Sequence, residues 1–205
     1  MNFSELPDSS VVEKTAKALA DHNYSVVIAK TKEEALSEII KAIPQGASVM
    51  NGSSVTLEQI GFVEYLKEGK HSWNNMHAAI VAEQDSEKQM QLREKAQLSD
   101  YYLGSVHALS ETGEYLVASN TGSQLPHLVY TSKNLILVVS TKKIVPNLDE
   151  AMKRLTEYVL PLEDKHIQEK YGMPTQLNTI LMVKGESSFS KRKITFILVE
   201  EDLGF

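Results

Sequence analysis

The sequence predicts an α/β protein with an open, mixed or parallel sheet and flanking helices. Apolar strand-like runs alternate with segments of helical periodicity, and clusters of turn-forming residues separate the two kinds. The chain has 205 residues, and no long linker divides it. We therefore expect residues 1–205 to form one domain, with the helical N-terminal part, residues 1–45, included in it.

The individual elements are predicted from periodicity and from residues that favour helix ends. Thr31 is expected to cap a helix, because Glu34 follows three residues later as in a capping box. Asn147 or Asp149 is expected to begin another helix, which Pro161 disturbs. The last two predicted strands are expected to pair with each other around a polar turn. Helices are predicted at 10–23, 31–43, 56–60, 62–66, 86–98 and 147–160, and strands at 25–29, 47–51, 101–109, 115–118, 135–139, 179–183 and 193–199.

The charge of the chain argues against a nucleic-acid partner. Its formal net charge is -6 at pH 7, whereas nucleic-acid binders usually present a basic face or stripe. A local loop or helix end can still bind an anion on an acidic protein. A small anionic metabolite therefore remains a possible ligand.

The sequence contains no cysteine. This excludes thiol catalysis, disulfides and iron–sulfur clusters held by cysteines of this chain, so any redox centre is expected on a partner or a bound cofactor, whose identity the residues do not indicate. The start of the chain lacks a signal-peptide pattern, and its longest apolar runs are too short to span a bilayer. We expect a cytoplasmic protein that does not bind membranes.

The first candidate ligand loop follows the strand predicted at 47–51. It contains Asn51, Gly52, Ser53, Ser54 and Thr56. Glycine allows close approach of the backbone to a ligand, and hydroxyls and amides at a helix start can hold an anion. In open α/β sheets, ligands bind beyond the carboxyl ends of strands. The alternative is an ordinary capped turn between a strand and a helix.

The second candidate ligand loop contains Asn120, Thr121, Gly122, Ser123 and Gln124, and follows the strand predicted at 115–118. This run of polar residues and glycine is longer than a helix cap requires, which favours binding of a carboxylate or phosphate. A capped turn is again the alternative interpretation.

Glu111 and His107 are the candidate catalytic residues. Glu111 precedes Thr112-Gly113 in a predicted turn and is a candidate nucleophile or general base, although glutamate at such a position is more often solvated. His107 alternates with apolar residues on a strand, so it is either an acid/base group or a buried, hydrogen-bonded histidine.

Lys143 is a candidate anion-binding residue near the end of the strand at 135–139, and Lys142 stands beside it. The alternative for this pair is solvated surface charge. No metal site is predicted, because His71 and His77 are six residues apart and there is no cysteine. Trp73 is expected to pack, or less often to act as a lid over a ligand.

The sequence resembles the LUD family over most of its length. The resemblance is most specific between about Asp100 and Asp164, while the N-terminal helix region matches only in pattern. The residues that support it are Asp100-Tyr101-Tyr102-Leu103-Gly104-Ser105, Glu111-Thr112-Gly113, Ala118-Ser119-Asn120-Thr121-Gly122-Ser123-Gln124-Leu125-Pro126, Asn134-Leu135-Ile136-Leu137-Val138-Val139, Lys143-Ile144-Val145-Pro146-Asn147-Leu148-Asp149-Glu150-Ala151, Tyr158-Val159-Leu160-Pro161-Leu162-Glu163-Asp164, Gly52-Ser53-Ser54-Val55-Thr56-Leu57 and Glu201-Asp202-Leu203-Gly204-Phe205.

This resemblance implies a fold like that of the sugar-phosphate isomerase and CoA-transferase superfamily. It also implies a link to oxidation of L-lactate, beside partners that contain iron–sulfur clusters. The leading hypothesis is therefore a lactate-utilization subunit that binds a small carboxylate or a phosphorylated or CoA-type ligand. The alternatives are a transferase or hydrolase that acts alone through Glu111, and a non-catalytic scaffold or regulator of an iron–sulfur oxidase complex.

Overall fold

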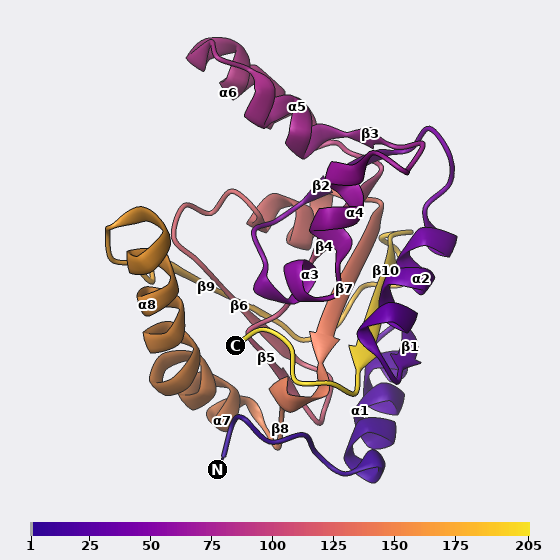
Figure 1. The fold of residues 1–205 in the computed structure, drawn as a ribbon. Helices are drawn as coiled ribbons and strands as arrows, with labels where there is room; N and C mark the ends of the chain where they lie inside the picture. The colour runs from indigo at the N-terminus through magenta and orange to yellow at the C-terminus, as the bar shows by residue number, and fades with distance from the viewer. Residues whose placement is uncertain (1) are drawn as a thin grey trace.

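The computed structural model describes residues 2–205, which form two β-sheets with helices around them (Figure 1). The larger sheet has six strands, all parallel, in the order β1-β10-β7-β4-β2-β3. This arrangement confirms the predicted α/β class and its open parallel sheet. The strands are β1 (Ser25–Ala29), β2 (Ser48–Asn51), β3 (Asn74–Asn75), β4 (Tyr101–Gly104), β7 (Asn134–Ser140) and β10 (Lys193–Val199).

The large sheet is buried on both faces because its central strands are apolar at successive positions. On β7, Leu135 and Leu137 pack into one hydrophobic cluster, while Ile136 and Val138 pack into another. The first cluster includes residues of helix α1 (Ser9–Asp21) and of the smaller sheet. The second includes residues of the helices that cover the opposite face, α2 (Lys32–Ala42), α3 (Val55–Gln59) and α4 (Phe62–Glu68).

The smaller sheet has four strands in the order β8-β5-β6-β9. Its centre is an antiparallel hairpin of β5 and β6, joined at the turn that Thr112-Gly113 predicted. Gly113 has a φ of 95°, a conformation that glycine adopts without steric cost. The strands are β5 (Ala108–Ser110), β6 (Tyr115–Ser119), β8 (Ile144–Val145) and β9 (Thr179–Val183).

Two strand predictions were wrong. The strand expected at 101–109 is two strands, β4 and β5, which belong to different sheets. The expected pairing of the last two strands does not form, because β9 pairs with β6 whereas β10 lies between β1 and β7. Burial explains the separation: β10 is buried along most of its length and suits the middle of a parallel sheet, whereas β9 keeps exposed residues and suits a sheet edge.

The predicted helices are confirmed with small differences at their ends, except for the one predicted at 147–160, and helix α5 was not predicted. Thr31 caps α2 by accepting a hydrogen bond of 3.2 Å from Glu34 N. The carboxylate of Glu34 accepts from Lys30 N rather than from Thr31 N, so only half of the capping box forms. The remaining helices are α5 (Met76–Ala82), α6 (Ser86–Ala96), η1 (His127–Thr131), η2 (Thr141–Lys143), α7 (Leu148–Lys153), η3 (Arg154–Val159) and α8 (Leu160–Tyr171).

The helix capped by Asn147 does not end near Pro161, as expected, but continues to Tyr171. It widens into a π-helical segment, η3, directly before α8. Pro161 therefore falls beside an irregular segment, where its missing N–H and bulky ring disturb fewer regular hydrogen bonds. As a result, α8 extends along one side of the molecule, while α5 and α6 project from the main body (Figure 1).

No helix within residues 2–205 is long and apolar enough to cross a lipid bilayer.

Candidate functional site

Two neighbouring cavities lie where the chain leaves the carboxyl ends of β2, β4 and β6. The small cavity has a volume of about 80 Å³, and its lining includes Thr56, Ser105 and Lys143. The large cavity has a volume of about 520 Å³ and extends between the candidate loops, α6 and α8. Both cavities are lined by Gly52, Ser53, His107, Gln124, Val159 and Glu163.

The structure brings the two candidate ligand loops to the same place. Asn51, Gly52 and Ser53 from the first loop line the large cavity. Asn120, Thr121, Ser123 and Gln124 from the second loop line it as well. The first loop also contributes Ser54 and Thr56 to the small cavity, which Lys143 lines too. Gly122 lines neither cavity and provides the turn with a φ of 76°.

Gly52 is required where the first loop passes the second. A β-carbon at this position would lie 2.5 Å from the hydroxyl oxygen of Tyr102 and 3.4 Å from Oε1 of Gln124. The first of these distances is too short for any side chain at the position. The close approach that glycine permits is therefore to Tyr102 within the protein.

Several polar groups of the two loops are already paired within the chain. Ser54 Oγ accepts a hydrogen bond from Leu57 N and caps α3. Gly122 N donates to Ser119 Oγ over 2.9 Å, and Ser123 N donates to Thr121 Oγ1 over 3.4 Å. The capped-turn interpretation thus describes part of both loops. The backbone amides of the second loop are less free to bind an anion than the sequence suggested.

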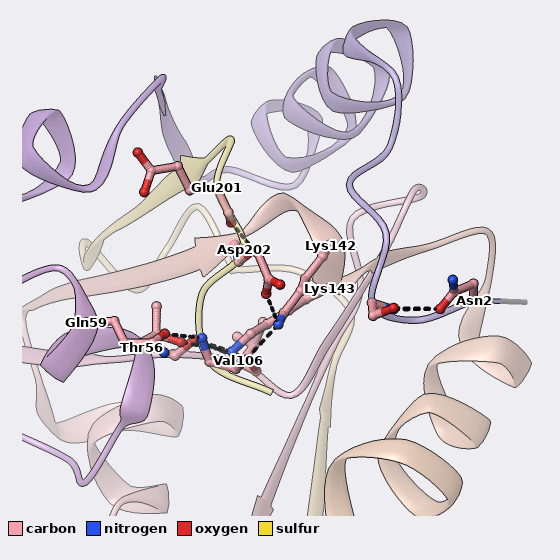
Figure 2. A network of polar contacts seen from close by, with 12 residues as sticks. Asn2, Thr56, Gln59, Val106, Lys142, Lys143, Glu201 and Asp202 are labelled. Atoms are coloured by element: carbon pink, nitrogen blue, oxygen red, sulfur yellow. Dashed lines mark hydrogen bonds and ion pairs between the residues drawn. The ribbon is translucent and has the colours of Figure 1, made fainter. Parts of the chain in front are cut away.

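Lys143 supplies positive charge to the small cavity. It lies in η2, and only 4% of its surface is exposed. Its Nζ donates to Thr56 Oγ1 over 3.0 Å, to Ser105 Oγ over 3.1 Å and to the carbonyl of Val106 over 3.2 Å (Figure 2). The solvated-charge interpretation of the lysine pair was wrong, because Lys142 is also buried and forms an ion pair with Asp202.

The charges nearest to Lys143 make its ammonium form less stable. Burial lowers the pKa of Lys143 well below its usual value, and the positive charges of Arg154 and Lys142 lower it further. The polar partners of Nζ within the described chain are two hydroxyls and a carbonyl, all of them uncharged. A negative charge placed in the small cavity would therefore stabilise the protonated lysine.

Arg154 adds a second buried cation that the sequence analysis missed. The residue is fully buried in η3, and its Nη1 donates to the carbonyl of His107. Its Nε and Nη2 have no hydrogen-bond partner among residues 2–205. Burial lowers the pKa of Arg154 to about 10, which leaves it protonated at neutral pH. Arg154 follows Ala151 by three residues and therefore lies on the apolar face of the predicted helix. This position is the feature of the sequence that could have predicted its burial.

His107 reaches both cavities as a neutral group. Its Nδ1 accepts a hydrogen bond of 3.1 Å from Ala118 N. Loss of water around the ring lowers the pKa of His107 to about 3, and the charges of Lys143 and Arg154 act in the same direction. A neutral ring that accepts at Nδ1 has its proton on Nε2. His107 is thus suited to donate a hydrogen bond to a ligand.

Glu163 is the carboxylate that the structure adds to the site. It lies on α8 and lines both cavities, and burial raises its pKa above the usual value. His166, on the same helix, lines the small cavity. The segment containing Glu163 contributed to the family resemblance. Because the helix was expected to end at Pro161, the sequence did not predict α8, which places Glu163 beside the ligand loops.

Glu111 lies outside this group of residues. It lines neither cavity, and its carboxylate accepts a hydrogen bond of 2.8 Å from the ammonium of Lys14 on α1. The structure therefore does not bring the two candidate catalytic residues together, since only His107 adjoins the ligand loops.

Within residues 2–205, no group of three or more histidine, aspartate or glutamate side chains is arranged to hold a metal ion. His71 stacks on Trp73, with ring centroids 5.3 Å apart. Trp73 is buried and donates from Nε1 to the carbonyl of Ile43. Its role is packing, as expected.

A family model for the LUD domain matches residues 12–199. The chain belongs to the LUD domain family. This match confirms the resemblance found in the sequence, and it spans every residue of the ligand loops together with Lys143 and Glu163.

Among solved structures, the LUD-domain chain is similar to a DUF162 family protein from Deinococcus radiodurans. The two share 13% sequence identity with a TM-score of 0.56, over 95% of this chain and 99% of the other. This likeness supports the fold. Comparison with curated proteins finds no match.

Proposed function

We propose that this LUD-domain protein binds a small carboxylate of the lactate and pyruvate class in the small cavity, as a subunit of an L-lactate-oxidising system. The supporting observation is the buried Lys143, whose hydrogen-bond partners are uncharged and whose pKa is lowered by burial and by the cations Arg154 and Lys142. An anion beside Nζ would compensate this positive charge in surroundings of low dielectric constant, where charge pairing is strong.

The groups around Lys143 suit a carboxylate ligand. Thr56 Oγ1 and Ser105 Oγ now accept from Nζ, and each hydroxyl can also donate its own proton to a ligand oxygen. His107 also lines the small cavity and has an Nε2–H group that can donate to a ligand. A carboxylate would thus meet one cation and several neutral donors, a combination that favours an anion over a neutral molecule.

Glu163 is the acid/base candidate in this proposal. Oxidation of lactate to pyruvate breaks the O–H bond and the bond between C2 and its hydrogen. A carboxylate next to the hydroxyl can accept the hydroxyl proton, and the C2 hydrogen would leave as a hydride, with both electrons, to an acceptor outside this chain. The chain has no cysteine with which to ligate an iron–sulfur cluster. We therefore assign the electrons to partner subunits that contain such clusters, and we retain a phosphorylated or CoA-type molecule as a further candidate ligand.

Isothermal titration of the purified protein with pyruvate, L-lactate and acetate tests this proposal. Replacing Lys143 with Met removes the charge and keeps an unbranched side chain, so we expect the affinity for pyruvate to fall about tenfold or more. The control is Lys17→Met, at an exposed ion pair on α1. Absence of binding by all three acids, or equal binding by Lys143→Met and wild type, would contradict the proposal.

Neither alternative function gains support from the geometry. Glu111 is paired with Lys14, and neither of the two cavities adjoins its carboxylate. A scaffold or regulator of an iron–sulfur oxidase complex predicts co-purification with cysteine-rich partners and no affinity for small acids. The titration above therefore separates the scaffold hypothesis from the leading one.

A further inference from the structure

The large cavity is much bigger than a small acid requires. Its volume of about 520 Å³ falls in the range of roughly 300–1,000 Å³ that is typical of sites for larger organic ligands. The small cavity of about 80 Å³ adjoins it and includes Lys143. The two cavities therefore offer space for a second molecule, or a second part of one molecule, beside the carboxylate.

Three carboxamide side chains line the large cavity in a common arrangement. In each of them the NH₂ group donates to a backbone carbonyl. Asn51 donates to Gly52 over 3.2 Å, Gln97 donates to Ser123 over 3.2 Å, and Gln124 donates to Ala118 over 2.9 Å. These bonds distinguish the nitrogen from the oxygen of each amide, because a carbonyl can pair only with the NH₂ side. The amide oxygens are consequently left as acceptors around the cavity.

Two of these acceptors are unsatisfied within the described chain. Asn51 Oδ1 and Gln97 Oε1 have no hydrogen-bond partner among residues 2–205, and both atoms are shielded from solvent. An unpaired, shielded carbonyl oxygen destabilises the protein. A ligand with N–H donors, after a small rotation of these amides, would remove this destabilisation, whereas a ligand with acceptors alone would not.

The wall of the large cavity that α8 supplies is apolar except at Glu163. Leu160, Ile167 and Tyr171 are seven and four residues apart along α8, so they lie on one face of that helix. Tyr171 is 61% exposed, and none of the residues of α8 is fully buried. A flat ring between this wall and the amides would bury apolar surface on its face and present polar groups at its edge.

We propose that the large cavity binds a planar heterocycle with amino or amide N–H donors, next to the carboxylate in the small cavity. The size of the cavity, its amide acceptors and its apolar wall are the three supporting observations. This inference extends the proposed function to a second ligand, but its first test uses uncharged molecules and so does not depend on carboxylate binding at Lys143.

Ligand-observed NMR titration with adenosine and nicotinamide tests the proposal. Each probe is compared with its N,N-dimethyl derivative, which keeps the ring and lacks the exocyclic N–H donors. We expect at least one parent compound to bind, and to bind about fivefold or more tightly than its dimethyl derivative. Gln97→Ala and Tyr171→Ala should weaken the binding at least about threefold, whereas Tyr130→Ala, an exposed tyrosine outside the cavity, should leave it unchanged.

The proposal is overturned if neither parent compound binds, if the dimethyl derivatives bind as tightly as the parents, or if Gln97→Ala and Tyr171→Ala bind like wild type. Lys143→Met separates the two proposals. It should lose pyruvate while it retains the neutral ring compound, and ring binding without any pyruvate binding would contradict only the proposed function.

Discussion

Lys143 Nζ lies 3.0 Å from Thr56 Oγ1, although the two residues are 87 positions apart in the sequence. The contact joins the start of α3, beyond β2, to the segment after β7. It closes the small cavity at the edge of the large sheet where both strands end. Because these partners are uncharged, none of them neutralises a protonated Lys143, and an anionic ligand would stabilise the charged form.

Lys143→Met should leave the unfolding midpoint unchanged or raise it. Burial of a charge without a counter-ion destabilises the folded state, and an apolar side chain of similar length removes that penalty. Thr56 and Ser105 can rotate their hydroxyls toward other acceptors. Thermal unfolding of the variant beside wild type measures this effect. A fall of the midpoint by several degrees would show that Lys143 stabilises the fold instead.

Gly52→Ala should destabilise the protein by about 1–3 kcal/mol, the usual cost of overpacking a filled site. The new methyl group would collide with the Tyr102 hydroxyl, which lies 2.5 Å from the ideal β-carbon position. Tyr102→Phe removes that oxygen, so the double variant should recover much of the loss. Urea unfolding of both single variants and the double variant gives the coupling energy. Strict additivity of the two changes would refute the proposed collision.

The affinity for pyruvate should decrease as the pH rises through the pKa of Glu163. Burial raises that pKa above the usual value, so Glu163 is neutral at lower pH and becomes negative as the pH increases. A negative Glu163 would repel a carboxylate in the shared cavity. Glu163→Gln stays neutral and should bind pyruvate with a flatter pH profile. Titrations between about pH 5 and about pH 8 check this, and identical profiles would exclude Glu163 from the site.

Stability should fall as the pH decreases from about 6.5 toward about 3 because of His107. Its pKa in the folded protein is about 3, against an ordinary value of 6.5, so the unfolded chain binds the proton first on acidification. The unfolded state gains protons that the folded state excludes, and this lowers the free energy of unfolding. His107→Asn retains an acceptor for Ala118 N and should lose less stability across this interval. Urea midpoints at several pH values provide the comparison, in which equal slopes would contradict the assignment.

Glu111→Gln should have little effect on either stability or pyruvate binding. The carboxylate pairs with Lys14, whose side chain is 64% exposed, and exposed pairs contribute only about 0.2–1 kcal/mol. Chemical unfolding and pyruvate titration of the variant measure the two effects. Loss of an enzymatic turnover in Glu111→Gln, with its fold intact, would instead support the alternative hypothesis of a transferase or hydrolase.

The sequence was sufficient to predict the layers of the fold and the place of the ligand loops. Both depend on local patterns: β7 is apolar at successive positions, and the polar loops follow the ends of β2 and β6 directly. The pairing of β9 and β10 was not predictable in this way, since it depends on which sheet has room for each strand. The short separation of the two strands in the sequence suggested that they form a hairpin. Instead, β10 pairs within the large sheet, where it is buried on both faces.

The charged residues of the site were harder to predict for a related reason. Glu163 and Arg154 lie on one helical segment that the sequence divided at Pro161. Their proximity to the loops depends on the continuation of that helix through η3, which no local rule indicates. Lys143 was proposed from the sequence as an anion-binding residue, but its burial arises from the packing of residues distant in sequence, such as Thr56 and Gly204.

Gly204 illustrates how such distant packing keeps water from the ammonium. Its backbone lies so near Thr56 and Lys143 that a methyl group there would overlap the threonine hydroxyl. The surrounding segment, residues 200–205, belongs to neither sheet and to no helix. It is held by side-chain bonds from Lys142 to the carbonyl of Gly204 and from Gly204 N to Gln59. The exclusion of water from Lys143 therefore depends on a stretch without regular backbone pairing, so local fraying there would hydrate Lys143 before either sheet opened.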